Sequence, residues 1–500
     1  MPKYLLGIDN GGTVIKAGLY DLNGREIAVA TSKTQMLMPT PGHAERDANE
    51  LWSANVQAIA AVIRQSGISP DEIIAVATTG HGNGLYLVDA QGNPVYPGIC
   101  STDVRAQKYV QQWYADGTFE RVLPKTMQSI WAAQPVALLA WFRDHQPEVV
   151  EQARWAFMCK DYLRYRLTGE AYAEITDMSG SSLMNIRDVT YDQELFQAYG
   201  IERYADKFPP LKHSAEICGH VTKAAAEQTG LRAGTPVAGG LFDIDACGIA
   251  TGMITPEKLC LVVGTWSINQ YISPTPIVSK SIFMTSLYCI PGYWLVLEGS
   301  PTSASNQEWF IAEFLGEAQT LTEQDGHSIY ERCNEWVAQI APEESHIIFL
   351  PFLYGANVGW DASACFLGIK GWHHRAHLLR AIYEGVIFSH RTHIEKLLAF
   401  REPPQAIRLT GGAARSEVWM QMFADVLQTS IEITAGTELG TLGAAICGGV
   451  ATGVFPSFEQ AAANMVQMTR VYTPDASKQA IYAEKYAAYR QAIATLRPLS

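Results

Sequence analysis

The sequence predicts an α/β protein built from two lobes. Its 500 residues exceed the size of about 250–300 residues at which one hydrophobic core usually stops growing. Strand-like runs alternate with helical patterns, and this order restarts near the middle of the chain. A Gly-Thr turn separates two strand-like runs in each half, at Gly12-Thr13 and at Gly264-Thr265, 252 residues further on. We therefore expect residues 1–248 and 249–500 to form two lobes facing a cleft, although other Gly-Thr pairs leave a chance match open.

Composition and charge exclude several classes of protein. Hydrophobic residues make up 48% of the chain and charged residues 17%, which excludes a disordered protein. The net charge of −13 argues against a nucleic-acid or anionic-membrane surface. An anionic ligand is still compatible with this charge, because a helix N-terminus or a metal ion makes a single pocket locally positive.

The nine cysteines are scattered singly, so neither a zinc site nor a disulfide framework is predicted. The chain opens on a strand-like run and lacks the basic region, apolar stretch and cleavage site of a signal peptide. No window approaches about 18 uninterrupted apolar residues. We therefore expect a soluble cytoplasmic protein.

The first half of the chain begins with three short strands within residues 3–32 and a turn at Asn23-Gly24. A capping box at Asp47–Glu50 predicts the start of a helix. Residues 73–80 predict a buried strand, and a hairpin follows around Gly92-Asn93. The pattern from about 104 to 175 is mostly helical.

The second half repeats this alternation. It is predicted to contain strands within 235–243, 258–273, 346–355, 406–412 and 430–434, and helices within 377–398, 417–428 and 440–453.

The stretch from Gly7 to Lys16 is the most informative motif. Gly11 and Gly12 allow backbone N–H groups to approach a ligand closely, and the hydroxyl of Thr13 adds a donor. Asp9, at the end of a strand, could hold a cation or its water. These residue types suit nucleotide phosphates with Mg²⁺. The alternative is a tight β-turn that Asp9 merely caps.

Two other nucleotide-binding motifs do not fit this stretch. A Walker loop needs Gly-Lys-Ser/Thr, but Gly12 is followed by Thr13-Val14. A dinucleotide fingerprint opens a helix, and here a strand-like run follows the glycines. An NAD-linked dehydrogenase is therefore excluded.

Asp243 ends an apolar strand directly before a run of small residues. A carboxylate there could be a general base that accepts a hydroxyl proton during phosphoryl transfer. It could also be an ordinary helix N-cap. Asp245 competes with it for the catalytic role.

Three further loops carry weaker signals. Gly411-Gly412-Ala413 lies between a strand and a helix, where backbone could lie against a nucleotide base or ribose. His81–Gly84 and Ser101–Arg105 follow predicted strands and offer hydrogen-bonding side chains of the kind that polyol recognition needs. The alternative for both is ordinary turn chemistry.

Taken in order, these motifs resemble the FGGY carbohydrate kinases of the sugar-kinase, actin and Hsp70 superfamily. The resemblance runs along essentially the whole chain and includes GIDNGGTVIKAGLYD, PGHAERD, STDVRA, KDYLRYRLTGE, VAGGLFD, VVGTWS, LPFLYG, RAIYEGVIFSH, LTGGAARSEVWMQMFAD and GTLGAA. Within this family the chain is most similar to bacterial L-xylulose kinases.

The resemblance implies two RNase H-like lobes around a central cleft, with ATP, Mg²⁺ and a small sugar as ligands. It implies that Asp243 is the catalytic base and that Asp9 positions the metal. The residues it assigns to the nucleotide and the metal are Asp9, Gly11, Gly12, Thr13, Lys16, Gly264, Thr265, Gly411, Gly412, Ala413 and Ser416. Those it assigns to the sugar are His81, Gly82, Asn83, Asp103, Arg105 and Asp243.

The sugar-binding positions depart from the family pattern more than the catalytic ones. Many relatives have His or Glu where Asn83 stands, and Trp where Ser101 stands. The predicted reaction is ATP-dependent phosphorylation of L-xylulose to L-xylulose 5-phosphate. The alternatives are a kinase for another ketose or polyol and a catalytically inactive sugar-binding regulator. A homodimer is also expected from the family.

Overall fold

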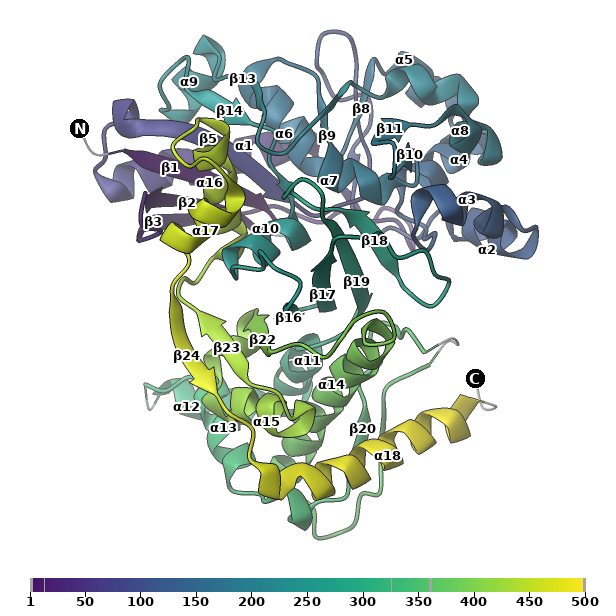
Figure 1. The fold of residues 1–500 in the computed structure, drawn as a ribbon, viewed down its shortest axis with the longest axis vertical. Coiled ribbons are helices and arrows are strands. Elements are labelled where there is room, and N and C mark those ends of the chain that lie inside the picture. Colours follow the sequence, from purple (N-terminus) through teal and green to yellow (C-terminus); the bar gives the residue numbers. More distant parts are fainter. Residues whose placement is uncertain (1–2, 13, 325, 359–361, 498–500) are drawn as a thin grey trace. The chain divides into compact units, whose positions relative to one another are not determined.

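A computed structural model describes residues 3–12, 14–324, 326–358 and 362–497 (Figure 1). The chain divides into two compact units. Unit 1 comprises residues 1–254, 272–296 and 435–467, and unit 2 comprises residues 255–271, 297–434 and 468–500. Each unit thus combines three segments, while the sequence predicts a single boundary after residue 248. The reason is that a helix from the C-terminal region completes the core of the first sheet.

Unit 1 is built on a seven-stranded sheet of order β13-β14-β5-β1-β2-β3, with β15 pairing alongside β5. The strands β1, β2 and β3 form an antiparallel meander, whereas β1 pairs with β5 in parallel. This confirms the three predicted opening strands. The bounds are β1 Tyr4–Asn10, β2 Val14–Asp21, β3 Glu26–Lys33, β5 Ile73–Gly80, β13 Ile217–His220, β14 Pro236–Ala238 and β15 Leu241–Phe242.

Successive residues of β1 point to opposite faces of this sheet, as in any strand. Leu6 and Ile8 join a core cluster that contains residues of α1 (Ala48–Ser66). Gly7 points toward α16 (Leu439–Ala451), and a Cβ there would lie 1.8 Å from the Thr441 carbonyl oxygen. The missing side chain at Gly7 therefore lets the helix backbone lie directly on the strand.

A second core cluster of unit 1 holds many of the helices that follow β5 in sequence, while Tyr162 and Ala225 of two later helices belong to the first cluster. This region confirms the mostly helical pattern predicted for 104–175. Its elements are β6 Tyr86–Val88, β7 Gly98–Ile99, α2 Gln107–Ala115, α3 Thr118–Thr126, α4 Pro135–His145, α5 Pro147–Gln152, β8 Trp155–Phe157, α6 Cys159–Thr168, α7 Ile175–Met178, α8 Gln193–Ala198, α9 Lys223–Thr229 and α10 Asp243–Ala250.

The second sheet has the order β18-β19-β17-β16-β22-β23-β24. As in unit 1, a hairpin (β16 and β17) has a first strand that pairs in parallel with a later strand, β22. The bounds are β16 Lys258–Val263, β17 Ser267–Ser273, β18 Met284–Leu287, β19 Trp294–Ser300, β22 Ala406–Thr410, β23 Ile431–Thr434 and β24 Met468–Tyr472. Residues 272–296 of this run belong to unit 1.

A long helix, α14 (Arg375–Leu397), packs on the sheet of unit 2 through buried histidines. His390 Nδ1 lies 2.8 Å from Asn269 Oδ1 of β17. The other helices and short strands of this region are α11 Ser305–Phe314, α12 Gly316–Gln324, α13 Ile329–Ala338, β20 Ile348–Leu350, β21 Cys365–Leu367, α15 Glu417–Leu427, α17 Phe458–Met465 (in unit 1) and α18 Gln479–Leu496. Within the described residues, no helix is both long enough and apolar enough to cross a membrane.

Two local predictions are wrong. Asp47 does cap α1, but Glu50 does not complete a capping box, because its carboxylate accepts a hydrogen bond from the Gln35 N–H at 2.9 Å. The strand predicted within 235–243 is interrupted at Gly239 and Gly240. Gly240 adopts a φ of 88°, which breaks the strand into β14 and β15.

We expect Gly7→Ala to destabilise the protein, because the added methyl group would meet backbone of α16 that has no room to move. Overpacking of this kind typically costs about 1–3 kcal/mol. Gly371→Ala is the matched control, since a Cβ there would meet no atom within 4 Å. Thermal unfolding of both variants measures the difference, and equal melting temperatures would contradict the close contact.

Candidate active site

The glycine turn that joins β1 to β2 is a tight hairpin. Gly11 N donates to the Val14 carbonyl at 3.2 Å. A Cβ built on Gly12 would meet no atom within 4 Å, so the backbone there faces open space in which a ligand could approach. Thr13, the third predicted phosphate-binding residue, lies outside the described residues.

Asp9 lies against the first turn of α16. A Cβ on Gly440 would sit 2.5 Å from Asp9 Oδ2, so only glycine leaves room for the carboxylate. The helix N-terminus favours negative charge, while burial raises the pKa of Asp9 to about 6 and the charge of Lys16 opposes that rise. No hydrogen-bond donor in the described part of the chain contacts this carboxylate. It is the kind of oxygen ligand that Mg²⁺ prefers, so the residue fits the predicted metal.

Lys16 lies opposite Asp9 in the register of β1 and β2. Its Nζ forms an ion pair with Glu438 Oε2 at 2.5 Å. The ammonium charge is therefore already balanced by a carboxylate that the sequence analysis did not single out. A phosphate contact from Lys16 stays a prediction.

Asp243 is the first residue of α10, directly after β15. The N-cap position belongs to Phe242, so the interpretation of Asp243 as an ordinary N-cap is wrong. Burial, together with the nearby charge of Asp9, raises the pKa of the Asp243 carboxyl to about 7. A half-buried carboxylate with this pKa is suited to accept a hydroxyl proton near neutral pH.

Asp245, the competing carboxylate, is enclosed. It has no solvent exposure, and its Oδ1 accepts a hydrogen bond from the Cys289 N–H at 3.1 Å. Burial raises the pKa of Asp245 well above its ordinary value. The geometry therefore favours Asp243 over Asp245 as the group that reaches a ligand.

Helix α16 supports both aspartates. A Cβ on Gly443 would lie 2.1 Å from the Ala246 carbonyl oxygen of α10. Because Gly440 faces Asp9 and Gly443 faces α10, one face of α16 carries the two elements on which Asp9 and Asp243 stand. This close packing explains why the charge of Asp9 acts on Asp243.

The predicted sugar loop at His81–Gly84 lies beside Asp243. His81 N donates to the Asn10 carbonyl at 3.0 Å, and a Cβ on Gly82 would lie 2.3 Å from the ring of Phe242. Burial lowers the pKa of His81 to about 3, so its imidazole is neutral. Asn83 is buried with a φ of 61°, and its Oδ1 has no hydrogen-bond partner among the described residues. Unit 1 therefore brings His81, Gly82 and Asn83 together next to Asp243.

The second predicted sugar loop is held by a network of its own. Asp103 accepts a hydrogen bond from Ala44 N at 2.7 Å and forms an ion pair with Arg105 Nη2 at 2.8 Å. The same nitrogen of Arg105 lies 2.7 Å from Glu45 Oε1, and the Arg105 side chain is fully buried. These contacts fix the loop, and a direct contact with a sugar stays a prediction.

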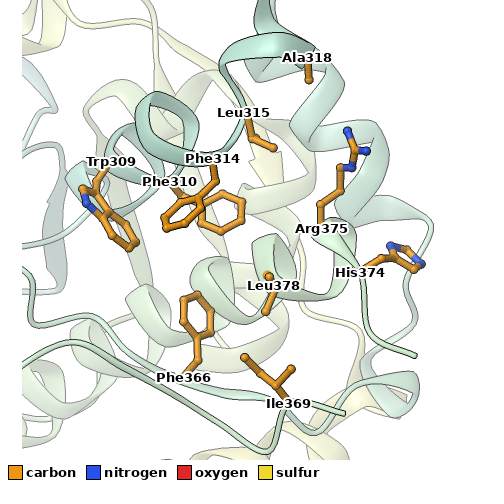
Figure 2. A pocket seen from close by; sticks show the side chains of 10 residues that line it. All are labelled: Trp309, Phe310, Phe314, Leu315, Ala318, Phe366, Ile369, His374, Arg375 and Leu378. Atoms are coloured by element: carbon orange, nitrogen blue, oxygen red, sulfur yellow. The ribbon is translucent and has the colours of Figure 1, made fainter. Parts of the chain in front are cut away.

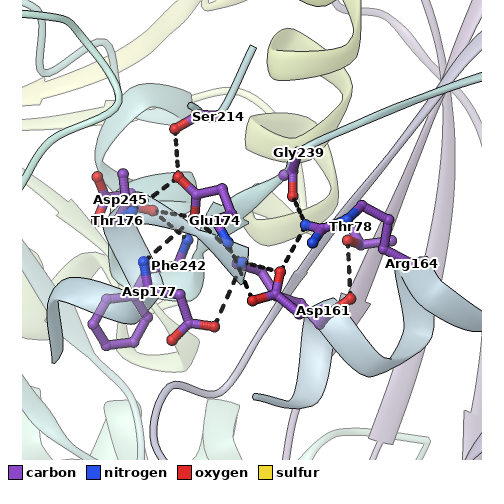
Figure 3. A network of polar contacts seen from close by, with 12 residues as sticks. Thr78, Asp161, Arg164, Glu174, Thr176, Asp177, Ser214, Gly239, Phe242 and Asp245 are labelled. Atoms are coloured by element: carbon purple, nitrogen blue, oxygen red, sulfur yellow. Dashed lines mark hydrogen bonds and ion pairs between the residues drawn. The ribbon is translucent and has the colours of Figure 1, made fainter. Parts of the chain in front are cut away.

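A buried charge network joins α6 to residues 174–177 (Figure 3). Lys160 Nζ is 2.7 Å from Asp161 Oδ1, 3.2 Å from Glu174 Oε2 and 3.6 Å from Asp177 Oδ2. Arg164 Nη1 lies 2.6 Å from Asp161 Oδ1. All five side chains have no solvent exposure, and burial raises the pKa of Asp177 well above its ordinary value.

This network positions the backbone that leads into Asp243. The Glu174 carboxylate accepts a hydrogen bond from the Thr176 hydroxyl at 2.8 Å, and that hydroxyl accepts one from the Phe242 N–H at 3.0 Å. The sequence analysis did not assign these residues a role. The available signal was the pair of cations at Lys160 and Arg164, four residues apart on one otherwise buried helix.

In unit 2, the Gly264-Thr265 turn is pinned to the start of α11. The Gly264 carbonyl accepts a hydrogen bond from Ala304 N at 2.8 Å, and the Thr265 carbonyl accepts one from Ser303 N at 2.9 Å. Ser305 Oγ adds a further donor to the same oxygen at 3.1 Å. The turn therefore has a defined backbone conformation.

Gly411 lies beside this turn within unit 2. It has a φ of 102°, and a Cβ there would lie 2.4 Å from the Val263 carbonyl oxygen. A Cβ on Gly412 would meet no atom within 4 Å, and Ala413 is buried. Ser416 caps α15 and donates to Asn334 Oδ1 at 2.7 Å. Of the residues predicted to bind the nucleotide, Gly264, Gly411 and Gly412 therefore lie close together in unit 2. Ser416 instead serves as the N-cap of α15.

A separate pocket of about 650 Å³ opens in unit 2 (Figure 2). Aromatic side chains from α11 and β21 line it, with His374 and Arg375 at one side. None of the predicted site residues contributes to it. No motif in the sequence predicts this pocket.

Comparison with known protein families shows to which family of proteins this chain belongs. The N-terminal domain of the FGGY family of carbohydrate kinases matches residues 4–249, and the C-terminal domain of that family matches residues 259–452. The chain therefore belongs to the FGGY family of carbohydrate kinases, which implies ATP as its phosphoryl donor and a small-molecule sugar as the acceptor.

Individual members of this family resemble the chain over nearly its whole length. The L-xylulose/3-keto-L-gulonate kinase of Escherichia coli K12 is 39% identical over 99% of this chain and 98% of its own length. A probable L-xylulose kinase of Pasteurella multocida is 37% identical over 99% of this chain and its full length. Among solved structures, the xylulose kinase of Rhodospirillum rubrum matches with a TM-score of 0.87 and 26% identity over 99% of both chains. The predicted α/β fold class and family are thereby confirmed.

We expect Asp243→Asn to stabilise the ligand-free protein above neutral pH. A carboxyl whose pKa rises on folding to about 7 destabilises the folded state increasingly as pH climbs from its ordinary pKa through 7. The neutral amide avoids this, so the melting-temperature difference should be small near pH 5 and larger at pH 8. Differential scanning calorimetry in metal-free buffer measures it.

Asp206→Asn is the control, because that side chain is exposed. Its effect on the melting temperature should vary little with pH. A constant or shrinking gain for Asp243→Asn from pH 5 to pH 8 would contradict the raised pKa.

Proposed function

We propose that this protein phosphorylates L-xylulose to L-xylulose 5-phosphate with ATP. The observation that carries the proposal is the half-buried Asp243 carboxylate, with a pKa of about 7, beside the polar loop at His81–Asn83. The relatives named for L-xylulose, at 37–39% identity over nearly the whole chain, support this choice of sugar.

In this proposal the glycine turns bind the phosphates of ATP. The backbone of the turn at Gly11-Gly12 in unit 1 and of the turn at Gly264-Thr265 in unit 2 would supply N–H donors to phosphate oxygens, as in other glycine-lined phosphate sites. The N–H groups of Gly11 and Gly264 are themselves bonded within their turns, to the Val14 and Trp266 carbonyls. Gly411 and Gly412 would lie against the adenosine. The open space over Gly12 and Gly412 supports both assignments.

Asp9 is the residue proposed to hold Mg²⁺. Its carboxylate oxygens are of the type this ion prefers, and burial has raised its pKa, so a cation there would restore the ionised form. When bound, Mg²⁺ supplies positive charge that balances the charge of the transferring phosphoryl group.

Asp243 is proposed to act as the general base. It would accept the proton of the sugar hydroxyl as that oxygen attacks the terminal phosphorus of ATP, and the bond to the departing ADP oxygen breaks. The buried network behind Phe242 holds the carboxylate in position. Helix α16 keeps Asp9 near enough to raise the proton affinity of this base.

The loop at His81–Asn83 is proposed to orient the sugar. The Asn83 amide oxygen, which has no partner among the described residues, offers a hydrogen-bond acceptor without a net charge. The neutral imidazole of His81 lies beside it, with long contacts of 3.4 Å from its two nitrogens to the Gly82 carbonyl and the Tyr86 hydroxyl. Such groups suit hydroxyl recognition. Asp103 and Arg105 would hold the neighbouring loop.

The name of the Escherichia coli relative adds 3-keto-L-gulonate, a sugar acid, to the substrates worth testing. The net charge of −13 supports a small-molecule partner rather than a nucleic acid. The cytoplasmic location and the homodimer stay predictions.

We expect L-xylulose to stimulate ADP release from ATP more than other sugars do. A coupled assay compares L-xylulose, D-xylulose, L-ribulose, erythritol, glycerol and 3-keto-L-gulonate, and NMR of the product locates the phosphate. If another ketose or polyol stimulates ADP release more strongly, that sugar and not L-xylulose is the substrate. No stimulation by any sugar would favour the inactive sugar-binding alternative.

We expect Asp243→Asn to lower kcat by about 10²–10⁴-fold, the usual contribution of a general base, while ATP binding changes little. Asp245→Asn is the matched control, because its amide oxygen can still accept the hydrogen bond from Cys289 N. Turnover of both variants, with nucleotide affinity from calorimetry, measures the contrast. Near-parental turnover by Asp243→Asn, or a larger loss at Asp245, would overturn the assignment of the base.

A further inference from the structure

Arg46 is a fully buried cation that interacts with both ligand loops of unit 1. It ends the short strand β4 (Glu45–Arg46), has no solvent exposure, and donates from Nη2 to the Gly11 carbonyl at 3.2 Å. Charged side chains are almost never fully buried unless they are paired. Each N–H group of this guanidinium is therefore expected to have an acceptor or an anion beside it.

Within the described residues, some N–H groups of Arg46 have no partner. Arg46 Nε and Nη1 have no hydrogen-bond partner there, and the guanidinium forms no ion pair with a carboxylate of those residues. The nearby Glu50 is engaged elsewhere, since its carboxylate accepts from Gln35 N. The buried Arg164 also has an Nε without a partner there, but its guanidinium pairs with the Asp161 carboxylate at 2.6 Å. An unpaired buried charge is strongly unfavourable unless a ligand supplies the missing anion.

The surroundings of Arg46 belong to the proposed ligand site. Gly11 is in the glycine turn, and the positive charge of Arg46 acts on His81 of the sugar loop, where burial is the larger cause of the low pKa. Because His81 is neutral, it does not balance the guanidinium. Asn10 Nδ2, Thr79 Oγ1 and Asn83 Oδ1 are also buried on these strands and loops with no partner among the described residues. Native structures leave few such atoms unpaired.

We propose that the free N–H groups of Arg46 bind an oxyanion of the ligand held between the glycine turn and the sugar loop of unit 1. The inference rests on the proposed function, because it assumes that sugar and phosphate occupy this site. The oxyanion has two possible sources, the phosphoryl group being transferred and the carboxylate of a sugar acid. Both accept charge-assisted hydrogen bonds from a guanidinium. Arg46 would thus make the site selective for ligands that carry such a group.

The test uses Arg46→Gln, which removes the charge and keeps one amide donor. Ligand-induced thermal shifts are measured in a chloride buffer with three probes: inorganic phosphate, 3-keto-L-gulonate and neutral L-xylulose. Losing charged hydrogen bonds typically weakens binding by about tenfold or more. We expect affinity for at least one anionic probe to fall by that factor and affinity for L-xylulose to stay within about twofold.

The two anionic probes distinguish the sources of the oxyanion. Selective loss of phosphate binding identifies the phosphoryl group, and kcat should then fall for every sugar. Selective loss of 3-keto-L-gulonate binding identifies the carboxylate, and KM should then rise for that sugar alone. Parental affinity of Arg46→Gln for both anions overturns the proposal, as does a parent protein that binds neither.

Arg164→Gln is the matched control for the loss of a buried guanidinium. It should lower the melting temperature of the free protein, because it removes one of the two cations that pair with the Asp161 carboxylate and a hydrogen bond to the Gly239 carbonyl. Arg46→Gln should leave that temperature unchanged or raise it. A melting temperature that falls as far as in Arg164→Gln would show that Arg46 has its anion within the protein, and would also overturn the proposal.

Arg46→Lys keeps the charge and loses the branched donor geometry. If Arg46→Gln does not fold, Arg46→Lys decides the question, and undiminished anion binding by that variant overturns the proposal. The binding measurements need no turnover. They therefore separate failure of this inference from failure of the proposed kinase activity, which the sugar panel tests.

Discussion

The close packing of α16 against β1 and α10 is the contact on which the candidate site of unit 1 depends. It exists because glycines stand where the backbones meet: Gly7 on the strand, and Gly440 and Gly443 on the helix. Any side chain at these positions would push the elements apart. With the glycines in place, the N-terminal turn of α16 meets Asp9 and the next turn supports the helix that begins with Asp243. The electrostatic coupling of the two aspartates follows from this backbone contact.

Burial of charge is the second organising feature of unit 1. The network around Lys160 pairs its cations with carboxylates and anchors the Phe242 backbone through Thr176. Arg46 is different, since its Nε and Nη1 have no hydrogen-bond partner among the residues that the structure describes. Arg164 has a carboxylate partner in Asp161, although its own Nε has no hydrogen-bond partner among the described residues. The presence of a paired carboxylate in one case and its absence in the other therefore separates these two buried guanidinium groups.

Much of the fold could be predicted from local patterns. The opening strands, the hairpin around Gly264-Thr265, the long helix through residues 377–398 and the small-residue helix after residue 438 all follow from hydrophobic periodicity and turn residues. The capping box at Asp47 was wrong because Glu50 is drawn to Gln35, a contact that local sequence does not encode. The break at Gly239 and Gly240 was missed because an apolar run with glycines is also compatible with one strand.

The sequence by itself determined the family, the α/β class and the identity of the candidate catalytic carboxylates, since these depend on residue types in a fixed order along the chain. Only the tertiary structure decided which of Asp243 and Asp245 is enclosed, and that the charge of Lys16 is balanced by Glu438. It also showed that Arg46 is buried with N–H groups that have no hydrogen-bond partner among the described residues. The physical reason is that solvation and charge pairing depend on neighbours from other elements, which lie tens to hundreds of residues away in the chain. Lys16 and Glu438 are 422 positions apart, and no local pattern records that they meet.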